Sequence, residues 1–402
     1  MADEEFVIRR EGLARVLVPN PELYRRSDGS YEPAWAPVFY NPAMVSNRDS
    51  TILILNAVGT RFRVVADSLA GTGVRGIRIA LEVPAVDKVF INDIDPRAHQ
   101  LIKMNVELNP DAKLRVVATR MDANELHGML RRIGMRPDYV DVDPYGSPAP
   151  FTFTALYTVR IGGIVGFTAT DLAPLGGKYP LKSLRRYHSY VMKTDFGKEL
   201  AIRNLLGFIA RTAGIIDRAV EPLLAYQHRH YIRIFVRVYS GAKRSLEMFS
   251  RKIGYIEYCP RCGFRRVVQG ITTPSGGGRC PICGARTVLL GPLWVSNLAD
   301  RDVVDKSLSL AEKLEWLSSR EELRIILESI RREDTIEVPY FRVSKAASYL
   351  KVNMPRVMQV IECLRDMGFS AVRSYMEPDA VRSDADYGSI IKCIEELGKR
   401  GS

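Results

Sequence analysis

Residues 63–76 read RVVADSLAGTGVRG, and this stretch decides the fold. A short apolar run ends at Asp67 and passes into a turn that contains Gly71 and Gly73. Glycine allows positive φ and a close approach of the backbone to a ligand before a helix begins. We therefore predict a buried strand, a cofactor-binding turn and a helix start. A tight turn without a ligand is the alternative, and Gly76 completes a spacing that dinucleotide-binding proteins also use.

Four further apolar runs follow, with helix-length segments between them. They lie at residues 88–93, 114–118, 138–142 and 163–168. Strands that alternate with helices indicate a parallel sheet whose two faces are covered. We therefore predict an α/β fold with a doubly wound, Rossmann-like sheet, which residues 230–239 extend by one amphipathic strand. Ligands of such sheets bind at the carboxyl ends of the strands.

Acidic residues stand where the first three of these strands end. Asp67 ends the first strand, and Asp93 ends the second, where a carboxylate can bind both hydroxyls of a ribose. Asp122 follows the third strand, beside Ala123, and can accept a hydrogen bond from the exocyclic amine of an adenine. With the glycines of the first turn, these positions predict a site for a cofactor that contains a nucleoside.

The fourth strand ends in VDVDPYGSP, residues 140–148. An amino group on a base is a weak nucleophile because its lone pair is delocalised into the ring. A carboxylate that accepts its N–H groups and an aromatic face that holds the base both favour group transfer to it. Asp143, Pro144 and Tyr145 resemble the Asp-Pro-Pro-Tyr motif of S-adenosylmethionine-dependent amino-methyltransferases, although the second proline is absent. The motif favours S-adenosyl-L-methionine over a dinucleotide, and a simple turn is the alternative.

The composition indicates a globular protein with an anionic partner. The chain has 402 residues, of which 46% are hydrophobic and 26% charged, and its formal net charge is +12. A basic protein attracts phosphate polymers through long-range forces and counterion release. The chain starts without the pattern of a signal peptide, and no run of about eighteen apolar residues follows. We therefore expect a cytoplasmic protein with no membrane association.

Four of the six cysteines form two copies of Cys-Pro-x-Cys-Gly, seventeen residues apart. They are Cys259, Cys262, Cys280 and Cys283. Each pair places two thiolates on a tight turn, and four thiolates complete a closed tetrahedral site. We predict one structural Zn²⁺ per chain in a zinc-ribbon-like module at residues 255–290, with a redox dithiol as the alternative. Cys363 and Cys393 are isolated in the sequence, which does not suggest a secreted disulfide scaffold.

Further segments carry weaker signals. Arginines 261, 265, 266, 279 and 286 surround the cysteines, where they either meet a phosphate backbone or are simply solvated. Residues 176–190 interleave cations with aromatic residues and suit the lining of a pocket for a flipped-out base, or else form a helix with packed tyrosines and solvated cations. Near the C-terminus, helices at 343–350 and 354–367 and a strand at 369–373 are compatible with a winged-helix-like unit.

These motifs occur in the order in which they stand in the tRNA guanine-26 dimethyltransferases, which the chain resembles from about residue 38 to residue 292. The resemblance covers Asn47-Arg48-Asp49, the loop at 67–76, Asn92-Asp93, residues 143–148 and the cysteine pairs. It implies two successive methylations of the N2 amine of guanosine 26 in tRNA. It also implies that Arg48, Arg75, Asp93, Asp122 and Ala123 contact the cofactor and that Asp143 accepts from the amine. Sequence physics alone favours a solvated Arg48 near the start of a helix at 51–60.

We predict two domains. Residues 1–242 would form the methyltransferase domain with an N-terminal extension, and residues 243–402 an α+β domain that binds tRNA and carries the four-cysteine module. We expect a monomer. Two alternatives remain open: an amino-methyltransferase that acts on ribosomal RNA or DNA, and a zinc-containing RNA-binding protein with an inactive methyltransferase fold.

Overall fold

The computed structural model describes residues 5–270, 277–333 and 336–400, which form two compact units. The cysteine pairs are joined by a glycine-rich connector at residues 273–278, of which residues 273–276 lie outside the described residues. The first unit comprises Met1–Thr168, Phe235–Val238 and Asp302–Arg324, and the second comprises Ala169–Ile234, Tyr239–Arg301 and Ile325–Ser402. The first unit thus takes in two segments that come late in the chain.

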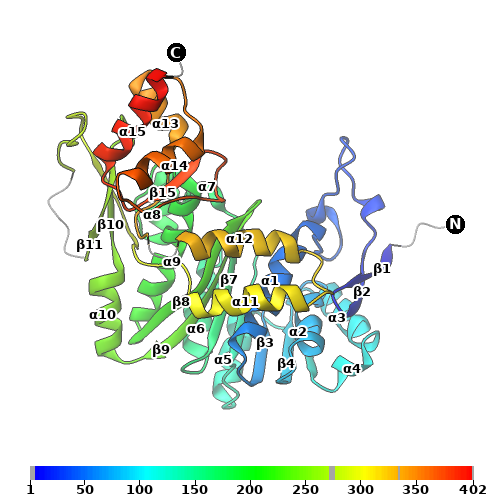
Figure 1. The fold of residues 1–402 in the computed structure, drawn as a ribbon. Coiled ribbons are helices and arrows are strands. Elements are labelled where there is room, and N and C mark those ends of the chain that lie inside the picture. The colour runs from blue at the N-terminus through cyan, green and yellow to red at the C-terminus, as the bar shows by residue number, and fades with distance from the viewer. Residues whose placement is uncertain (1–4, 271–276, 334–335, 401–402) are drawn as a thin grey trace. The chain divides into compact units, whose positions relative to one another are not determined.

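Seven strands form the main sheet, in the order β5-β4-β3-β6-β7-β9-β8. Figure 1 labels β3, β4, β7, β8 and β9 of this sheet. They are β3 (Phe62–Asp67), β4 (Val86–Asn92), β5 (Val116–Thr119), β6 (Tyr139–Val142), β7 (Ile164–Ala169), β8 (Arg218–His228) and β9 (Tyr231–Ser240). The first five pair in parallel, which confirms the predicted parallel core, and β9 confirms the strand expected at 230–239. Strand β8 was not predicted. The strand order reverses between β3 and β6, so their carboxyl ends flank the point at which such sheets bind ligands.

Helices connect the strands of the first unit. They are α1 (Val45–Val58), α2 (Val74–Glu82), α3 (Pro96–Glu107), α4 (Pro110–Lys113), α5 (Ala123–Arg132), α6 (Ala149–Thr158) and, later in the chain, α11 (Arg301–Lys313) and the start of α12 (Arg320–Glu333). The helix predicted at 51–60 begins earlier, at Val45. The reason is a 3-10 turn, Pro42–Met44, which the side chain of Asn41 caps and which leads directly into α1.

An N-terminal hairpin, which the sequence did not predict, precedes the sheet. Strands β1 (Phe6–Glu11) and β2 (Ala14–Pro19) pair antiparallel. Two 3-10 turns, Pro21–Leu23 and Pro33–Trp35, follow. The hairpin turns at Gly12, whose φ is 56° and where an added Cβ would lie 2.2 Å from Glu82 Oε1. Glycine is therefore required at this close approach to α2.

The second unit contains helices and two small sheets. Its helices are α7 (Leu172–Leu175), α8 (Pro180–Tyr187), α9 (Gly197–Gly214), α10 (Ala242–Lys252), the rest of α12, α13 (Val343–Leu350), α14 (Val357–Asp366) and α15 (Tyr387–Arg400). One sheet has the order β11-β10-β12, from β10 (Ile253–Tyr258), β11 (Arg265–Gln269) and β12 (Val288–Trp294). The other has the order β13-β15-β14, from β13 (Phe341–Arg342), β14 (Ala371–Arg373) and β15 (Ala380–Ser383). The two helices and the strand expected near the C-terminus are confirmed.

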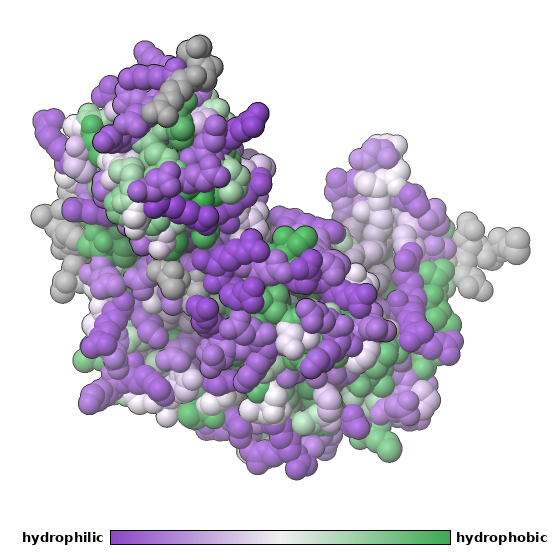
Figure 2. Space-filling model, in the orientation of Figure 1, coloured by the Kyte–Doolittle hydropathy of each residue, from purple (hydrophilic) through white to green (hydrophobic). Residues whose placement is uncertain are grey.

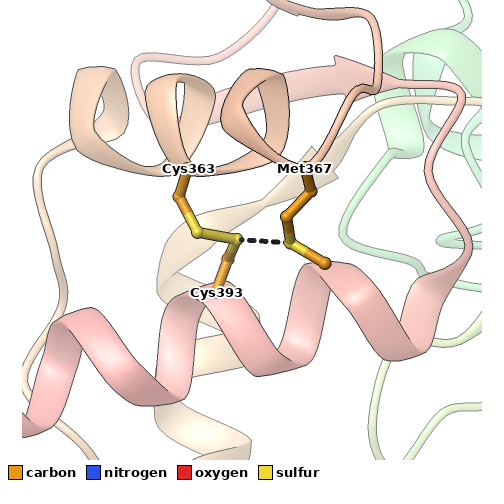
Figure 3. The surroundings of a disulfide bond; sticks show 3 residues. All are labelled: Cys363, Met367 and Cys393. Atoms are coloured by element: carbon orange, nitrogen blue, oxygen red, sulfur yellow. Dashed lines mark hydrogen bonds between the residues drawn. A yellow bond between two sulfur atoms is a disulfide. The ribbon is translucent and has the colours of Figure 1, made fainter.

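A disulfide joins Cys363 of α14 to Cys393 of α15, two cysteines that stand alone in the sequence (Figure 3). Their Cα atoms lie 6.1 Å apart, and the sulfur of Met367 lies 3.5 Å from that of Cys393. The bond closes a loop of 30 residues. Helices α14 and α15 also share one buried apolar cluster with Cys259 and Cys262. The C-terminal helices and the cysteine pairs therefore have a common core.

The described residues contain no helix that is long and apolar enough to cross a membrane. On the face seen in Figure 2, hydrophilic residues predominate and apolar residues form smaller patches among them.

Candidate functional site

The loop after β3 lies where the strand order of the sheet reverses, and backbone contacts fix its course. The amide of Gly71 donates to Asp93 Oδ2 at 2.8 Å, and the amide of Gly76 donates to Asp67 Oδ2 at 2.9 Å. Gly71 and Gly73 have φ values of 55° and 78°, which side-chain-bearing residues rarely adopt. The loop therefore needs both glycines to pass close to its neighbours and enter α2.

The acids that follow β4 and β5 have different local roles. Asp93 is half-buried, and burial raises the pKa of its carboxyl. Its Oδ1 accepts from the amide of Asp95 at 3.0 Å, which leaves lone pairs on both oxygens for a ligand. Asp122 caps α5, because its Oδ1 accepts from the amide of Asn124 at 2.8 Å. Ala123 begins that helix and is buried.

The residues after β6 combine a carboxylate with an exposed aromatic ring. The side chain of Asp143 is 20% exposed, and Pro144 is buried. Tyr145 is 66% exposed. The ring of Phe39 meets that of Tyr145 edge to face, with their centroids 4.4 Å apart. A partly exposed acid therefore adjoins, in the chain, an aromatic pair from two separate segments.

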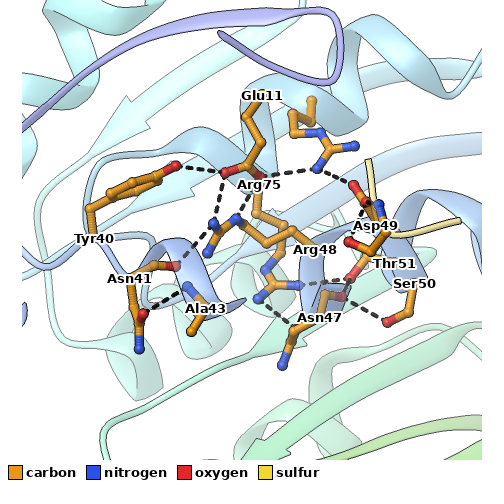
Figure 4. A network of polar contacts seen from close by, with 12 residues as sticks. Glu11, Tyr40, Asn41, Ala43, Asn47, Arg48, Asp49, Ser50, Thr51 and Arg75 are labelled. Carbon is orange, nitrogen blue, oxygen red and sulfur yellow. Dashed lines mark hydrogen bonds and ion pairs between the residues drawn. The ribbon is translucent and has the colours of Figure 1, made fainter. Parts of the chain in front are cut away.

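Every guanidinium nitrogen of Arg75, on the first turn of α2, has a partner, and Figure 4 shows the contacts with Asn47 and Thr51. Its Nη2 contacts the carboxylate of Asp143 and donates to Asn47 Oδ1 at 3.0 Å. Its Nη1 donates to Thr51 Oγ1 at 2.7 Å, and its Nε lies 3.3 Å from Asp141 Oδ1. The guanidinium therefore fixes the position of the Asp143 side chain. Two residues expected in separate roles, Arg75 and Asp143, meet in this structure.

Two further acids, Asp67 and Asp141, are buried behind this contact. The hydroxyl of Tyr139 donates to Asp141 Oδ2. Burial, and next the charge of Asp141, raise the pKa of Asp67 to about 7. With Asp143, these carboxylates lie around the guanidinium of Arg75. This edge of the sheet is therefore rich in acids, which suits a positively charged ligand.

Arg48 pairs with Glu11 rather than with the acids at the sheet edge, and Figure 4 shows this pair. Its Nε and Nη2 donate to the two carboxylate oxygens of Glu11 at 2.6 and 2.7 Å, and Nη2 also donates to the carbonyl of Asn41 at 3.2 Å. The hydroxyl of Tyr40 donates to the same carboxylate at 3.0 Å. Arg48 is buried, so the alternative of a solvated arginine is wrong. Its contact with a cofactor stays a prediction.

Arg78 extends this network into the body of the first unit. Its Nη1 lies 3.0 Å from Glu11 Oε1 and 2.7 Å from Asp49 Oδ1, and its Nε donates to Glu82 Oε1 at 2.8 Å. Burial alone would raise the pKa of Glu11, but the two arginines outweigh it and lower that pKa to about 2. The N-terminal hairpin is therefore fastened to α1 and α2 by charge.

The sequence analysis missed several residues of this region. Glu11 lies in a hairpin with no recognisable motif, Asn47 precedes the predicted helix start at residue 51, and Thr51 stood only as the first residue of that helix. Asp141 looked like an ordinary strand residue. Phe39 had one usable signal, because it stands just before the Asn41-Pro42 turn in a segment that precedes the sheet.

The four paired cysteines gather at one point in the second unit. All four sulfur atoms lie within 4.8 Å of one another, with two distances of 3.5 Å, and none of them is in a disulfide. A tetrahedral Zn–S distance of about 2.3 Å requires sulfur atoms roughly 3.8 Å apart. Gly263 and Gly284 have φ of 89° and 69°, and each donates its amide to the first cysteine of its pair at 2.9 Å. The geometry and the donor set fit a closed metal site.

The arginines around these cysteines divide into two groups. Arg265 is buried and its Nη2 lies 2.5 Å from Asp195 Oδ2, so its expected meeting with a phosphate backbone is wrong for this residue. Arg261, Arg266, Arg279 and Arg286 are exposed, and Arg266 Nε donates to Glu257 Oε2 at 2.6 Å. Sequence could not separate the groups, because burial depends on the core that the C-terminal helices complete.

Comparison with known proteins gives matches over nearly the whole chain. Residues 15–395 match the family described as N2,N2-dimethylguanosine tRNA methyltransferase. The chain is 35% identical to the tRNA (guanine(26)-N(2))-dimethyltransferase of Saccharolobus solfataricus, covering 96% of this chain and 98% of that protein. It is 37% identical to the Aeropyrum pernix protein of the same name, covering 98% of each. Trm1 from Pyrococcus horikoshii, solved in complex with S-adenosyl-L-methionine, superposes with a TM-score of 0.83 at 32% identity, covering 96% of this chain and 99% of that one.

Proposed function

Because the chain belongs to the N2,N2-dimethylguanosine tRNA methyltransferase family, we propose that it methylates the N2 amine of guanosine 26 in tRNA, once and then again. The methyl donor is S-adenosyl-L-methionine. The single observation that carries this proposal is the Asp143-Pro144-Tyr145 motif at the carboxyl end of β6, next to the glycine loop of β3 in the sheet. This motif supplies a carboxylate that can accept the N–H groups of a planar amine and an aromatic ring that can hold its base.

The residues around the β3 loop would hold the donor. Asp93 would bind the ribose hydroxyls, since its oxygens keep free lone pairs, and Asp122 with Ala123 would meet the adenine. Gly71 and Gly73 would let the backbone of the loop approach the donor, and Asp67 would hold this loop through the amide of Gly76. The negative charge of the sheet edge favours a sulfonium cation. Arg48 and Arg75 would reach the carboxylate of the donor only if each gave up a present contact.

Asp143 and its neighbours would act on the guanosine. The donor, when bound, supplies an electrophilic methyl group on a positively charged sulfur. Asp143 and the carbonyl beside it would accept the two N–H groups of the amine and aim its nitrogen along the line of the sulfur–methyl bond. A nitrogen–carbon bond would form as the carbon–sulfur bond broke, and the proton that the amine loses would pass to Asp143 and from there to water. Tyr145 and Phe39 would hold the base by their rings.

For the second unit we propose two roles. The four paired cysteines would bind one structural Zn²⁺ in a zinc-ribbon-like module at residues 255–290, because four thiolates leave no open coordination position. Of the predicted tRNA-binding domain at residues 243–402, the part that lies in the second unit, without residues 302–324, would bind tRNA, with Arg261, Arg279 and Arg286 as exposed cations near the module. We also propose that the protein is cytoplasmic and acts as a monomer.

The test is incubation of the purified protein with labelled donor and separate pools of tRNA, ribosomal RNA and DNA, followed by nucleoside analysis. We expect N2-methylguanosine and N2,N2-dimethylguanosine in tRNA alone. A tRNA variant with adenosine at position 26 should stay unlabelled. Label in ribosomal RNA or DNA instead would favour a different amino-methyltransferase, and no label in any pool would favour an inactive RNA-binding protein.

A further inference from the structure

The outer face of helix α8 exposes apolar side chains that packing does not explain. Leu181 is 79% exposed and Leu184 is 47% exposed. Residues three apart on a helix are neighbours on its surface. Single exposed leucines are ordinary, but two adjacent ones on a helix of eight residues form a small apolar ridge.

Cations surround this ridge, and no acid accompanies them in the sequence. Residues 176–190 contain four lysines and arginines and no aspartate or glutamate. Lys178, Lys182 and Arg185 are exposed, and Arg185 stands four residues after Leu181, on the same side of the helix. The surface therefore complements a partner that is both negatively charged and able to receive apolar groups. A nucleic acid with an opened base stack has this combination.

Hydrogen bonds from side chains on the inner face of α8 hold the helix in place. Ser183 is fully buried, and its hydroxyl accepts from Asn204 Nδ2 at 2.9 Å. The hydroxyl of Tyr187 donates to Asp171 at 2.6 Å, and Arg186 Nη1 donates to the same carboxylate at 2.8 Å. A ridge that is held this way keeps its shape when it is pressed into a partner.

Aromatic rings stand at both ends of the helix. Tyr179 is 50% exposed with Lys178 Nζ 5.7 Å from its ring centroid, and Tyr190 is 39% exposed. Exposed aromatic faces bind unstacked bases with little regard for sequence. The earlier expectation of packed tyrosines with solvated cations therefore holds for Tyr187, which is buried, and fails for Tyr179 and Tyr190.

The proposed reaction needs such a device, and the inference rests on that proposed function. A guanosine stacked inside tRNA cannot present its N2 amine to a donor until it leaves the stack. We propose that α8 is the wedge that enters tRNA as the target guanosine leaves. Leu181 and Leu184 occupy the space vacated in the stack, while Lys182 and Arg185 bind the flanking phosphates. The two leucines lower the free energy of the tRNA state in which the target base is flipped out. The two cations set the affinity for tRNA.

The test compares two variants on two tRNA substrates in single-turnover and steady-state assays. One substrate is folded tRNA, and the other lacks the nucleotide that faces the target guanosine, so that this base is already loosely held. The double variant Leu181→Ala, Leu184→Ala should methylate folded tRNA about tenfold more slowly or worse, with little change in KM, and should recover on the second tRNA. The double variant Lys182→Ala, Arg185→Ala should raise KM on both and reduce the salt dependence by about one unit per lost phosphate contact.

Two residues at the end of helix α4, outside the proposed tRNA-binding segments, supply matched controls. Leu114 is 96% exposed and Lys113 is exposed, so Leu114→Ala and Lys113→Ala should behave like the wild type on both tRNAs. An equal loss on both substrates, or no loss, for the leucine variant would overturn the wedge. Circular dichroism and thermal unfolding should match the wild type, since these leucines bury little surface. Wild-type protein that methylated neither tRNA would instead overturn the proposed function itself.

Discussion

The two ends of the chain are secured in different ways. At the N-terminal end, the hairpin is fastened by buried ion pairs in which Glu11 binds Arg48 and Arg78. In the C-terminal part, a disulfide and a cluster of four thiolates tie the elements together. Ion pairs depend on pH, whereas sulfur links depend on redox state and metal. We therefore expect acid to destabilise the N-terminal hairpin, and reductants and chelators to destabilise the C-terminal part.

Loss of the thiolate cluster should have the largest effect. We expect about one zinc per chain in the purified protein, and the double variant Cys259→Ser, Cys280→Ser should release it. Residues 258–284 should then unfold and tRNA binding should weaken, while donor affinity stays largely unchanged because the donor residues lie in the first unit. Metal analysis, hydrogen exchange and calorimetry check this. Parallel loss of donor and tRNA binding would show that the module belongs to the catalytic core.

Breaking the disulfide should come next. The double variant Cys363→Ser, Cys393→Ser opens a loop of 30 residues and should lower the free energy of unfolding by about 3.5 kcal/mol. Denaturant titration measures this loss. Dithiothreitol should reproduce it in the wild type with zinc retained. A variant as stable as the wild type would mean that the two cysteines do not link in solution.

Acid should loosen the N-terminal region by a similar amount. The pKa of Glu11 is lowered to about 2 from an ordinary value of 4.5, so its contribution is present above pH 4.5 and is lost as the pH falls toward 2. The shift corresponds to about 3 kcal/mol. Glu11→Gln should be less stable at neutral pH and should lack this part of the acid dependence. Urea titrations at several pH values test it, and an unchanged acid profile would contradict the assignment.

Asp143→Ala should lower turnover by about two orders of magnitude while fold and donor affinity remain. The reason is that the carboxylate orients and deprotonates the amine. Single-turnover rates with tRNA measure the effect. Turnover near that of the wild type would remove Asp143 from the mechanism.

Asp93→Ala should have the smallest effect, a loss of donor affinity of about tenfold, because a ribose contact is made in the ground state. Calorimetry with S-adenosyl-L-methionine measures it, with Asp95→Ala as a matched control two residues away. Unchanged affinity would contradict the ribose role.

The parallel core was predictable because each of its strands is a short apolar run bounded by turn residues, and the strand ends place Asp67, Asp93 and Asp143 along one edge. The cysteine pairs were predictable from local spacing alone. The contact of Arg75 with Asp143 was not, since the two are 68 residues apart and meet only through the order of β3 and β6. The same holds for Glu11 and for the disulfide, whose partners share no local pattern.

The return of residues 302–324 to the first unit has a consequence for biosynthesis. Ser319 donates its amide and hydroxyl to Asp49 Oδ2 at 2.9 and 2.8 Å, and Trp316 Nε1 donates to Glu82 Oε2 at 3.1 Å. Both acceptors are buried, and a buried carboxylate without its partners is costly. A nascent chain cannot complete the first unit until residue 324 has been translated, which is about four-fifths of the chain. In a fragment that stopped at residue 242, Asp49 and Glu82 would lack the hydrogen bonds from Ser319 and Trp316. The first unit of such a fragment would therefore be less stable than that of the complete chain.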